Sequence, residues 1–188
     1  MKYYKKLIGK NIYLSPFSDE DYILFTEWIN DYETARDLNQ FSNVFSLEDE
    51  KDFVENTKKS NKIYLSIVKE ENDELIGNIS LANIDNIHKT ATLGIMIGKK
   101  DERGKGYGTE AITLMLDYAF NYLNLNNIML EALCTNIKAV KCYEKCGFKK
   151  MGIRRESSYI NGKYRDNIFM QILKKDFLKK QRKSNSKK

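Results

Sequence analysis

The sequence predicts a mixed α/β (α+β) fold in which helices flank a central, twisted and mostly antiparallel sheet of about seven strands. Three observations support this fold class. Segments with the two-residue period of strands alternate along the chain with segments of helical period. Neighbouring strand segments are joined by short polar turns, which favours antiparallel pairing. The 188 residues suffice for one substantial core, and we expect residues 1–178 to form a single domain.

The first third of the chain predicts one strand followed by two helices. A short strand over residues 11–15 ends at Pro16. Ser18 precedes three acidic residues and is a candidate N-cap of the first helix, and Ser46 begins the second helix, which runs toward residue 59. The polar stretch 32–45 between them is expected to be a loop or a broken helix.

The middle of the chain predicts three antiparallel strands. Residues 61–69 alternate around Ile63, Leu65 and Ile67. A polar turn at 70–73 leads to a strand over 75–84. A second turn near 85–88 leads to a strand over 91–97, so that the three strands pair with their sequence neighbours.

The last part of the chain predicts two helices and three strands. A strand over 128–133 is followed by a helix over 136–145, which Gly147 ends. Strands over 148–159 and 164–173 flank Asn161-Gly162, a strong hairpin signal. Before them, helical periodicity covers residues 109–123, with an apolar stripe that comprises Ile112, Met115, Ala119, Tyr122 and Leu123.

The positive charge lies at the C-terminus. The chain has 32 Lys and Arg against 26 Asp and Glu, a net charge of +6. Residues 174–188 contain eight of the basic residues and one acid, so the rest of the chain is close to neutral. We therefore expect residues 179–188 to be a disordered basic tail. Nucleic acid is not an expected partner, although an RNA-contacting tail stays an alternative reading.

Two further features define the expected environment. No segment reaches the roughly 18–20 apolar residues of a membrane span, and the basic N-terminus lacks the apolar region of a signal peptide, so we expect a cytoplasmic protein. The cysteines Cys134, Cys142 and Cys146 form no CxxC pair, and His88 is the single histidine. Reduced structural thiols and no metal site are expected.

Glycines concentrate where a strand leads into a helix. Gly94, Gly98, Gly104, Gly106 and Gly108 fall within fifteen residues. At such a turn backbone N–H groups can converge, the helix N-terminus adds partial positive charge, and Arg103 and Lys105 add full charges, which favours binding of a pyrophosphate. The Walker pattern is absent, and residue 109 is Thr, so GxGxxG is not completed.

Two motifs in this order resemble the GNAT N-acetyltransferase superfamily. Arg103-Gly-Lys-Gly106-Tyr-Gly108 is similar to its Q/R-x-x-G-x-G/A loop for acetyl-coenzyme A. The segment 136–148, Asn-Ile-Lys-Ala-Val-Lys-Cys-Tyr-Glu-Lys-Cys-Gly-Phe, resembles the N-x-x-A-x-x-x-Y-E-K-x-G-F segment. The stretches 7–14 and 27–31 are similar to the RimJ/RimL-type branch. The resemblance covers about residues 7–178.

The resemblance implies a GNAT fold and acetyl-coenzyme A as co-substrate. It implies that backbone N–H groups of the loop hold the pyrophosphate and that the pantetheine arm pairs with the preceding strand. Tyr143 is the position that donates a proton to the leaving thiolate in family members. Asn136 lies two helical turns before it and is either a cofactor contact or only an N-cap. The cofactor-binding candidates are Ile95, Met96, Ile97, Arg103, Gly104, Lys105, Gly106, Tyr107, Gly108, Thr109 and Asn136.

No general base is assigned from the sequence. Many relatives carry Glu in the cofactor strand where this chain has Thr92. A water chain, Glu131 on the next strand, Asp85 or His88 are alternatives for receiving the proton of the amine.

The acceptor is expected to be bound by the first two helices and the last hairpin. The substrate-binding candidates are Trp28, Tyr32, Glu131 and Tyr159, with Phe41 and Phe45 as further aromatic residues. Similarity over 87–89 and 159–170 extends to spermidine N-acetyltransferases. A polyamine site needs carboxylates, however, and the loop 36–45 has a single one, Asp37.

The sequence thus predicts an acyltransferase that moves an acetyl group from acetyl-coenzyme A to a primary amine by direct attack. The acceptor is expected to be a small-molecule amine or a protein N-terminal amine. A polyamine acetyltransferase is the alternative within this class. A non-catalytic acyl-coenzyme A-binding or RNA-associated module is the alternative of another class, and a homodimer is left open because exposed strand edges in this fold often pair.

Overall fold

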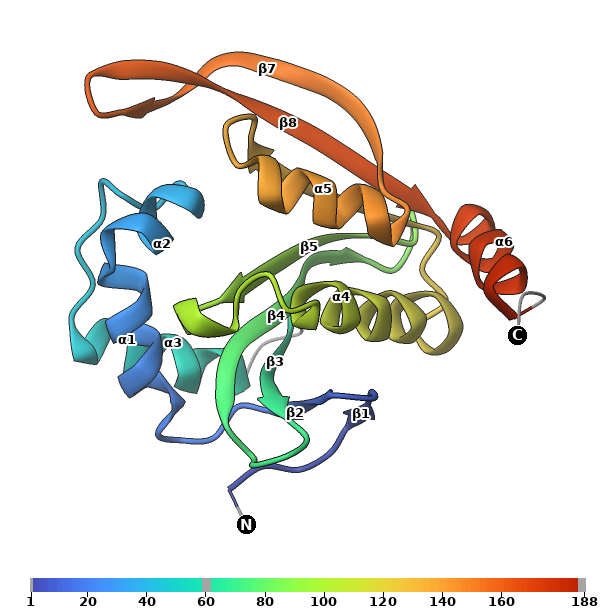
Figure 1. Cartoon of the computed structure of the whole chain (residues 1–188), viewed down its shortest axis with the longest axis horizontal. Helices are drawn as coiled ribbons and strands as arrows, with labels where there is room; N and C mark the ends of the chain where they lie inside the picture. Colours follow the sequence, from blue (N-terminus) through green and yellow to red (C-terminus); the bar gives the residue numbers. More distant parts are fainter. Residues whose placement is uncertain (1, 59–61, 186–188) are drawn as a thin grey trace.

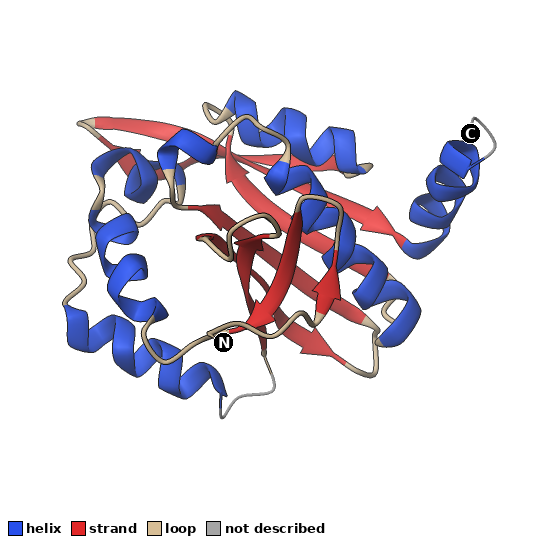
Figure 2. Ribbon diagram, turned by 60° about the horizontal axis from the view of Figure 1, so that its bottom comes forward, coloured by secondary structure: helices blue, strands red, loops and turns tan. Residues whose placement is uncertain are grey.

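The computed structural model describes residues 2–58 and 62–185. It contains one eight-stranded sheet with the order β1-β2-β3-β4-β5-β6-β8-β7, flanked by helices (Figures 1 and 2). The strands are β1 (Leu7–Ile8), β2 (Ile12–Pro16), β3 (Ile63–Lys69), β4 (Leu75–Asp85), β5 (Thr90–Ile97), β6 (Asn127–Leu133), β7 (Lys149–Ile160) and β8 (Lys163–Leu173). The expected fold class is confirmed, with β1 as one more strand than the sequence predicted.

The helices follow the expected order. They are α1 (Asp21–Asn30), α2 (Tyr32–Asp37), α3 (Leu47–Lys58), α4 (Tyr107–Asp117), α5 (Ile137–Cys146) and α6 (Lys174–Asn185), with a 3₁₀ turn (Lys100–Glu102) and a π-helical turn (Tyr118–Tyr122). The stretch 32–45 is a broken helix, as expected, because α2 is followed by a loop. Residue 59, the expected end of the second helix, and residue 61, the expected start of the strand over 61–69, lie outside the described residues.

The sheet is antiparallel except where β5 meets β6. These two strands pair in parallel over only three residues, Thr90–Thr92 against Asn127–Met129. β5 then continues to Ile97, paired on its other side with β4 as far as Gly77. β6 continues to Leu133, paired on its other side with β8. The edges of β5 and β6 that face each other are therefore unpaired beyond these three residues.

Alternation along the strands separates two cores on opposite faces of the sheet. The larger core contains Leu93 of β5 and buries Ile112 and Met115 of α4. The smaller one contains Met96 of β5 and buries Phe25 and Trp28 of α1. Because neighbouring residues of β5 serve different cores, the sheet holds α4 on one face and α1 on the other.

Local capping signals are confirmed at three elements. The N–H of Asp49 donates to Ser46 Oγ at 3.2 Å, and the Ser46 N–H donates to Asp49 Oδ2 at 2.7 Å, which caps α3 from both directions. Gly147 ends α5 with φ 106°. Asn161 and Gly162 both have positive φ, 51° and 74°, as a two-residue hairpin turn requires.

Ser18 is not the N-cap of α1, which begins at Asp21 without a side-chain cap. The Asp21 side chain is fully buried and accepts from the Ser18 N–H at 3.0 Å, from Tyr3 Oη at 2.8 Å and from Ser66 Oγ at 2.6 Å. A buried carboxylate needs such donors, and two of them come from distant segments, Tyr3 before β1 and Ser66 of β3. The acid, rather than the serine, therefore organises this turn.

Two expectations about exposed segments are also wrong. Tyr122 is 73% exposed, because the π-helical turn after α4 shifts it off the apolar stripe. Residues 179–185 continue α6 instead of being disordered. Phe177 of that helix is buried with its ring 5.3 Å from the ring of Phe120, which holds the helix to the larger core. Residues 186–188 lie outside the described residues.

Candidate active site

The unpaired edge of β5 is the first part of the site. The Gly98 N–H donates to the Ile76 carbonyl of β4 at 2.9 Å. Backbone groups alternate between the two edges of a strand, so Met96 also faces β4, whereas Ile95 and Ile97 face the open edge. Of the three strand candidates, Ile95 and Ile97 thus offer backbone groups to an extended ligand that pairs with this edge. The backbone of Met96 faces β4 instead, and its side chain lies in the smaller core.

The glycine loop directly follows this edge. Gly104 and Gly106 have φ of 80° and 98°, and a Cβ atom at either would meet no other atom within 4 Å. α4 begins at Tyr107 with Gly106 as its N-cap and has no side-chain cap. The first N–H groups of a helix have no partner within it. Residues 104–109 therefore present backbone donors and the positive end of α4 on an open surface, which suits an anion.

The two cations of the loop already have partners in the protein. Arg103 Nε donates to the Ile97 carbonyl at 2.8 Å, and its Nη2 donates to Thr34 Oγ1 at 2.7 Å. Lys105 Nζ donates to Glu102 at 2.8 Å, a bond that raises the lysine pKa. Arg103 thus joins the loop to the end of β5 and to α2. Both side chains thus have partners within the protein, and the expectation that they add positive charge for a pyrophosphate stays a prediction.

α5 carries Asn136 and Tyr143. Asn136 Oδ1 accepts from the Ala139 N–H at 3.1 Å, so this residue is the N-cap of α5. Tyr143 packs against the larger core with its ring 6.1 Å from the ring of Phe148. Burial, followed by the nearby cysteines, raises its pKa well above the usual value for tyrosine. The phenol therefore stays protonated at neutral pH, as a proton donor must.

Cysteines join α5 to the start of α4. Cys142 Sγ lies 3.3 Å from Thr109 Oγ1, and Cys146 Sγ lies 3.8 Å from the Thr109 carbonyl. The contact with Cys142, together with burial, raises the pKa of Cys146. All three cysteines are free thiols. Their contacts place the segment that bears Tyr143 beside the anion loop.

Among the base candidates, Glu131 lies nearest to the open edge. It follows Met129 by two residues on the same face of β6, at the level where β5 has separated. Asp85 instead accepts from the N–H groups of Ile87 and His88 at 2.8 and 2.7 Å in the β4–β5 turn. That turn precedes Thr90, which is about 17 Å from Ile95 along the strand. The structure brings neither Asp85 nor His88 to the open edge.

The acceptor candidates divide into two groups. Trp28 is buried against Gly98, where a Cβ atom would lie 2.0 Å from its indole ring, and it also lines a cavity near the β3–β4 turn that contains no residue of the glycine loop. Tyr32 and Tyr159 are 45% and 64% exposed. The Tyr32 hydroxyl accepts from the Asn161 side chain, so the hairpin tip reaches α2 across the site (Figure 1).

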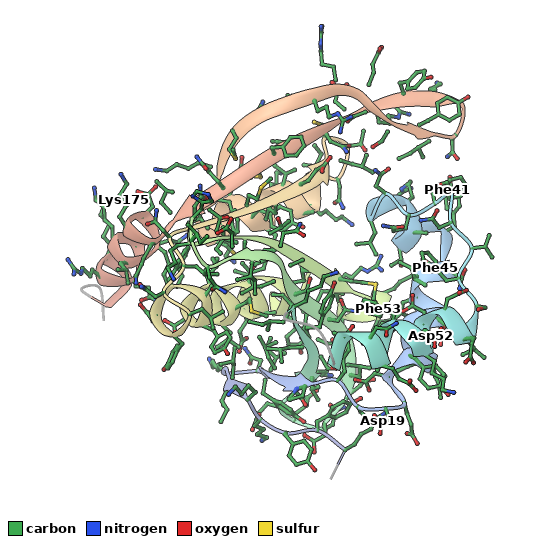
Figure 3. All side chains as sticks on the ribbon, turned by 180° about the vertical axis from the view of Figure 1, so that it is seen from behind. Asp19, Phe41, Phe45, Asp52, Phe53 and Lys175 are labelled. Atoms are coloured by element: carbon green, nitrogen blue, oxygen red, sulfur yellow. The ribbon has the colours of Figure 1, made fainter. Side chains whose placement is uncertain are left out.

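The loop between α2 and α3 carries further aromatic residues on the same side. The Phe41 ring lies 5.1 Å from the ring of Tyr32. Figure 3 shows Phe41 and Phe45 together on this loop, at the opposite end of the molecule from Lys175 on α6. We call the group of Tyr32, Phe41, Phe45 and Tyr159 the aromatic entrance. The aromatic entrance and the basic helix α6 are therefore separate surfaces.

The carboxylates next to this entrance are paired. Asp37 lies 2.9 Å from Arg36. Lys100 lies 2.8 Å from Asp31 and 3.4 Å from Glu33, and its hydrogen bond lowers the pKa of Asp31 to about 2. These acids already balance protein cations, which reduces the charge available to a polycationic ligand.

Other hollows and clusters do not coincide with the site. A cavity of about 380 Å³ near the β3–β4 turn has Tyr3, Glu27 and Asp73 in its wall but no residue of the glycine loop or of β6. Within residues 2–58 and 62–185, no three His, Cys, Asp or Glu side chains are grouped as metal ligands would be. In the same part of the chain, no helix is long and apolar enough to cross a membrane.

Comparisons with known proteins agree with this geometry. The family model of the acetyltransferase (GNAT) domain matches residues 11–149. The chain belongs to the GNAT acetyltransferase family. It is therefore an acyltransferase that uses acetyl-coenzyme A. The probable N-acetyltransferase YjcK of Bacillus subtilis is 32% identical over 181 residues, which cover 90% of this chain and 98% of YjcK.

Spermidine acetyltransferases are also similar to this GNAT acetyltransferase. The spermidine N(1)-acetyltransferase of Vibrio cholerae is 39% identical over 112 residues, 60% of this chain and 64% of that protein. The crystal structure of the spermidine N-acetyltransferase from Vibrio cholerae, in complex with CoA and spermine, superposes with a TM-score of 0.83 at 28% identity. The superposition covers 90% of this chain and 99% of that one.

Sequence reasoning missed two residues near the site of this GNAT acetyltransferase. Glu110, in the first turn of α4, accepts from the Lys10 and Asn11 N–H groups at 2.5 and 2.8 Å. Asn167 of β8 donates to Glu131 at 2.6 Å. Both contacts join residues far apart in sequence, and no spacing pattern announces them. An acid in the first turn of a helix was the single available signal, for Glu110.

Proposed function

We propose that this protein transfers the acetyl group of acetyl-coenzyme A to a primary amine by direct attack. The observation that carries the proposal is the unpaired edge of β5 running into a glycine loop with open backbone donors. Bound acetyl-coenzyme A supplies the thioester. Ile95 and Ile97 would pair with its pantetheine arm, an N–H of this edge would polarise the carbonyl oxygen, and residues 104–109 would hold the pyrophosphate.

Tyr143 is proposed to donate the proton that the leaving thiolate takes up. Its position on α5 supports this role, because the neighbouring Cys142 contacts Thr109 at the start of α4 and so places this segment beside the anion loop. We expect Tyr143→Phe to lower kcat by about 100-fold with little change in the KM for acetyl-coenzyme A. The matched control is Tyr118→Phe, which removes another phenol from a ring packed on the same core. Full turnover of Tyr143→Phe, where chemistry limits the rate, would remove Tyr143 from the mechanism.

Glu131 is proposed to receive the proton of the attacking amine. It is exposed on β6 beside the open edge, and Thr92 replaces the acid that many relatives have on β5. Gly94 is exposed on the same face of β5, so no side chain of that residue covers the surface between the two strands. An acceptor that reaches this surface would meet Glu131.

The acceptor is proposed to be a small-molecule amine or a protein N-terminal amine, with the protein in the RimJ/RimL-type branch. The aromatic entrance around Tyr32 and Tyr159 supports an amine with an apolar or flat neighbouring group. The similarity to spermidine acetyltransferases favours a polyamine as the second candidate. The pairing of Asp31 and Asp37 with cations argues against it.

A thiol-release assay tests the proposed function and separates these acceptors. Acetyl-coenzyme A is offered with spermidine, alanine- and serine-ended peptides, amino sugars and aminoglycosides. Turnover with a peptide or a sugar supports the first candidate, and spermidine turnover with a micromolar KM selects the polyamine. Binding of acetyl-coenzyme A without turnover on any amine would instead support a non-catalytic acyl-coenzyme A-binding module.

A further inference from the structure

Two buried polar side chains lie behind Glu131. Ser158 of β7 and Asn167 of β8 are each 4% exposed. The Ser158 hydroxyl donates to Asn167 Oδ1 at 3.1 Å, and Asn167 Nδ2 donates to Glu131 Oε1 at 2.6 Å. Buried polar groups are stable only when they are bonded, and these bonds form a chain that leads from the interior of the hairpin to one exposed carboxylate.

A bulge in the hairpin creates this arrangement. Arg154 pairs with Asn167 and Ser158 pairs with Arg165, so the three residues 155–157 of β7 lie opposite the single residue Asp166 of β8. Glu156 in the bulge has φ 51°, and its N–H donates to Asp166 Oδ1 at 2.9 Å. Bulges re-aim side chains, and strained residues are often found beside functional sites. Here the bulge places Ser158 against Asn167.

The Glu131 carboxylate determines which way the Asn167 amide points. A carboxylate only accepts, so the donor end of the amide faces Glu131. The acceptor end then lies against Ser158, whose hydroxyl donates to it and holds the amide from behind. Among the described residues, Glu131 receives its one side-chain hydrogen bond through Oε1, which leaves Oε2 without a protein donor.

We propose that Asn167, held from behind by Ser158, is the positioning residue that holds Glu131 as the base for the acceptor amine. This inference rests on the proposed function. The Asn167 donor stabilises the charged carboxylate and fixes its rotamer beside the open edge of β5. Oε2 is then free to take the proton as the amine nitrogen forms its bond to the acetyl carbon and the thiolate leaves with the proton of Tyr143.

The test measures kcat and the KM of each substrate, with acetyl-coenzyme A and an amine that the wild type acetylates. Without its donor the carboxylate is no longer held beside the amine, so we expect Asn167→Ala to lower kcat about tenfold with the KM for acetyl-coenzyme A unchanged. Ser158→Ala should lower kcat by less, again with that KM unchanged. Glu131→Gln should lower kcat about 100-fold.

A double variant separates positioning from structural support. If Asn167 acts through Glu131, Asn167→Ala in the Glu131→Gln background costs no more than about twofold beyond Glu131→Gln alone. The matched control is Gln171→Ala. Gln171 accepts from Asn127 Nδ2 at 3.0 Å and so joins the same two strands at the paired end of β6, away from the open edge. This control should leave kcat unchanged.

Three results would overturn the inference. The first is an unchanged kcat in both Asn167→Ala and Ser158→Ala, and the second is a full multiplicative loss in the double variant. If thermal melting shows that Asn167→Ala does not fold, an unchanged kcat in Ser158→Ala alone is enough. The third is a wild type that binds acetyl-coenzyme A yet acetylates no amine. That last result also overturns the proposed function, whereas the first two leave the function standing.

Discussion

Glu110 is predicted to fasten the start of α4 to the β1–β2 turn. Its carboxylate accepts from the N–H of Lys10 at 2.5 Å, from the N–H of Asn11 at 2.8 Å and from Asn11 Nδ2 at 2.9 Å, with the Ile12 N–H farther away at 3.4 Å. Glu110→Gln keeps the size of the side chain but leaves one acceptor oxygen. The NH2 of the amide replaces the other oxygen, so that a donor then lies where the carboxylate accepted a hydrogen bond.

The expected cost follows from these bonds. A hydrogen bond to a buried charged group contributes about 1.5–3 kcal/mol, and the partial exposure of this site reduces each contribution. We expect Glu110→Gln to lower the free energy of unfolding by about 2 kcal/mol at pH 7. For a chain of this size, that corresponds to a fall in Tm of about 4–8 °C.

The cost should depend on pH in a defined direction. Burial raises the pKa of Glu110, but the bonds from Asn11, Lys10 and Ile12 lower it further, so the net pKa lies below the usual value of 4.5. A carboxylate with a depressed pKa stabilises the fold above its unfolded pKa and loses this effect as pH falls through its folded pKa. The difference between wild type and variant should therefore shrink below about pH 4.

Urea unfolding at pH 7 and pH 3.5 measures this difference. The control is Glu55→Gln, which changes an exposed glutamate of α3 and should have little effect at either pH. Equal unfolding free energies for wild type and Glu110→Gln at pH 7 would refute the reasoning. So would a difference of the same size at both pH values, because the charge would then have no part in it.

Two glycine substitutions test the loop and the strand that leads into it. Gly106→Ala puts a side chain at φ 98° on the open surface of the loop, so we expect the KM for acetyl-coenzyme A to rise about tenfold while kcat changes little; an unchanged KM would show that the cofactor does not use this backbone. Gly98→Ala brings a Cβ atom to 2.0 Å from Trp28, which we expect to destabilise the fold by about 3 kcal/mol. Trp28 is the single tryptophan, so its fluorescence during urea unfolding reports that loss, and an unaltered midpoint would contradict the packing argument.

Features with local causes could be predicted from the sequence. Ser46 caps α3 through Asp49, three residues away, and Asn161-Gly162 turns the hairpin by itself. The glycine loop and α5 were likewise recognisable, because each is a continuous segment with its own motif. The space around Gly104 and Gly106 is open.

The contacts that fill the site could not be predicted in this way. Arg103 was expected to face the ligand, but its guanidinium joins Ile97 to Thr34, which lies 69 residues earlier. Trp28 was expected to line an acceptor pocket, but Gly98 allows it to pack into the smaller core, and the cavity that it lines contains no residue of the glycine loop. In each case a side chain met a better partner from a distant element, and sequence spacing carries no information on such meetings.

The sequence by itself determined the elements, the anion loop and the family, because these depend on capping, turn chemistry and residue order within short segments. Only the tertiary structure decided that β5 and β6 separate after Thr92 and that Asn167 bonds to Glu131. Strand divergence and cross-strand bonds depend on how distant segments pack around two cores. The open edge where the chemistry is proposed to take place is therefore a property of the folded sheet.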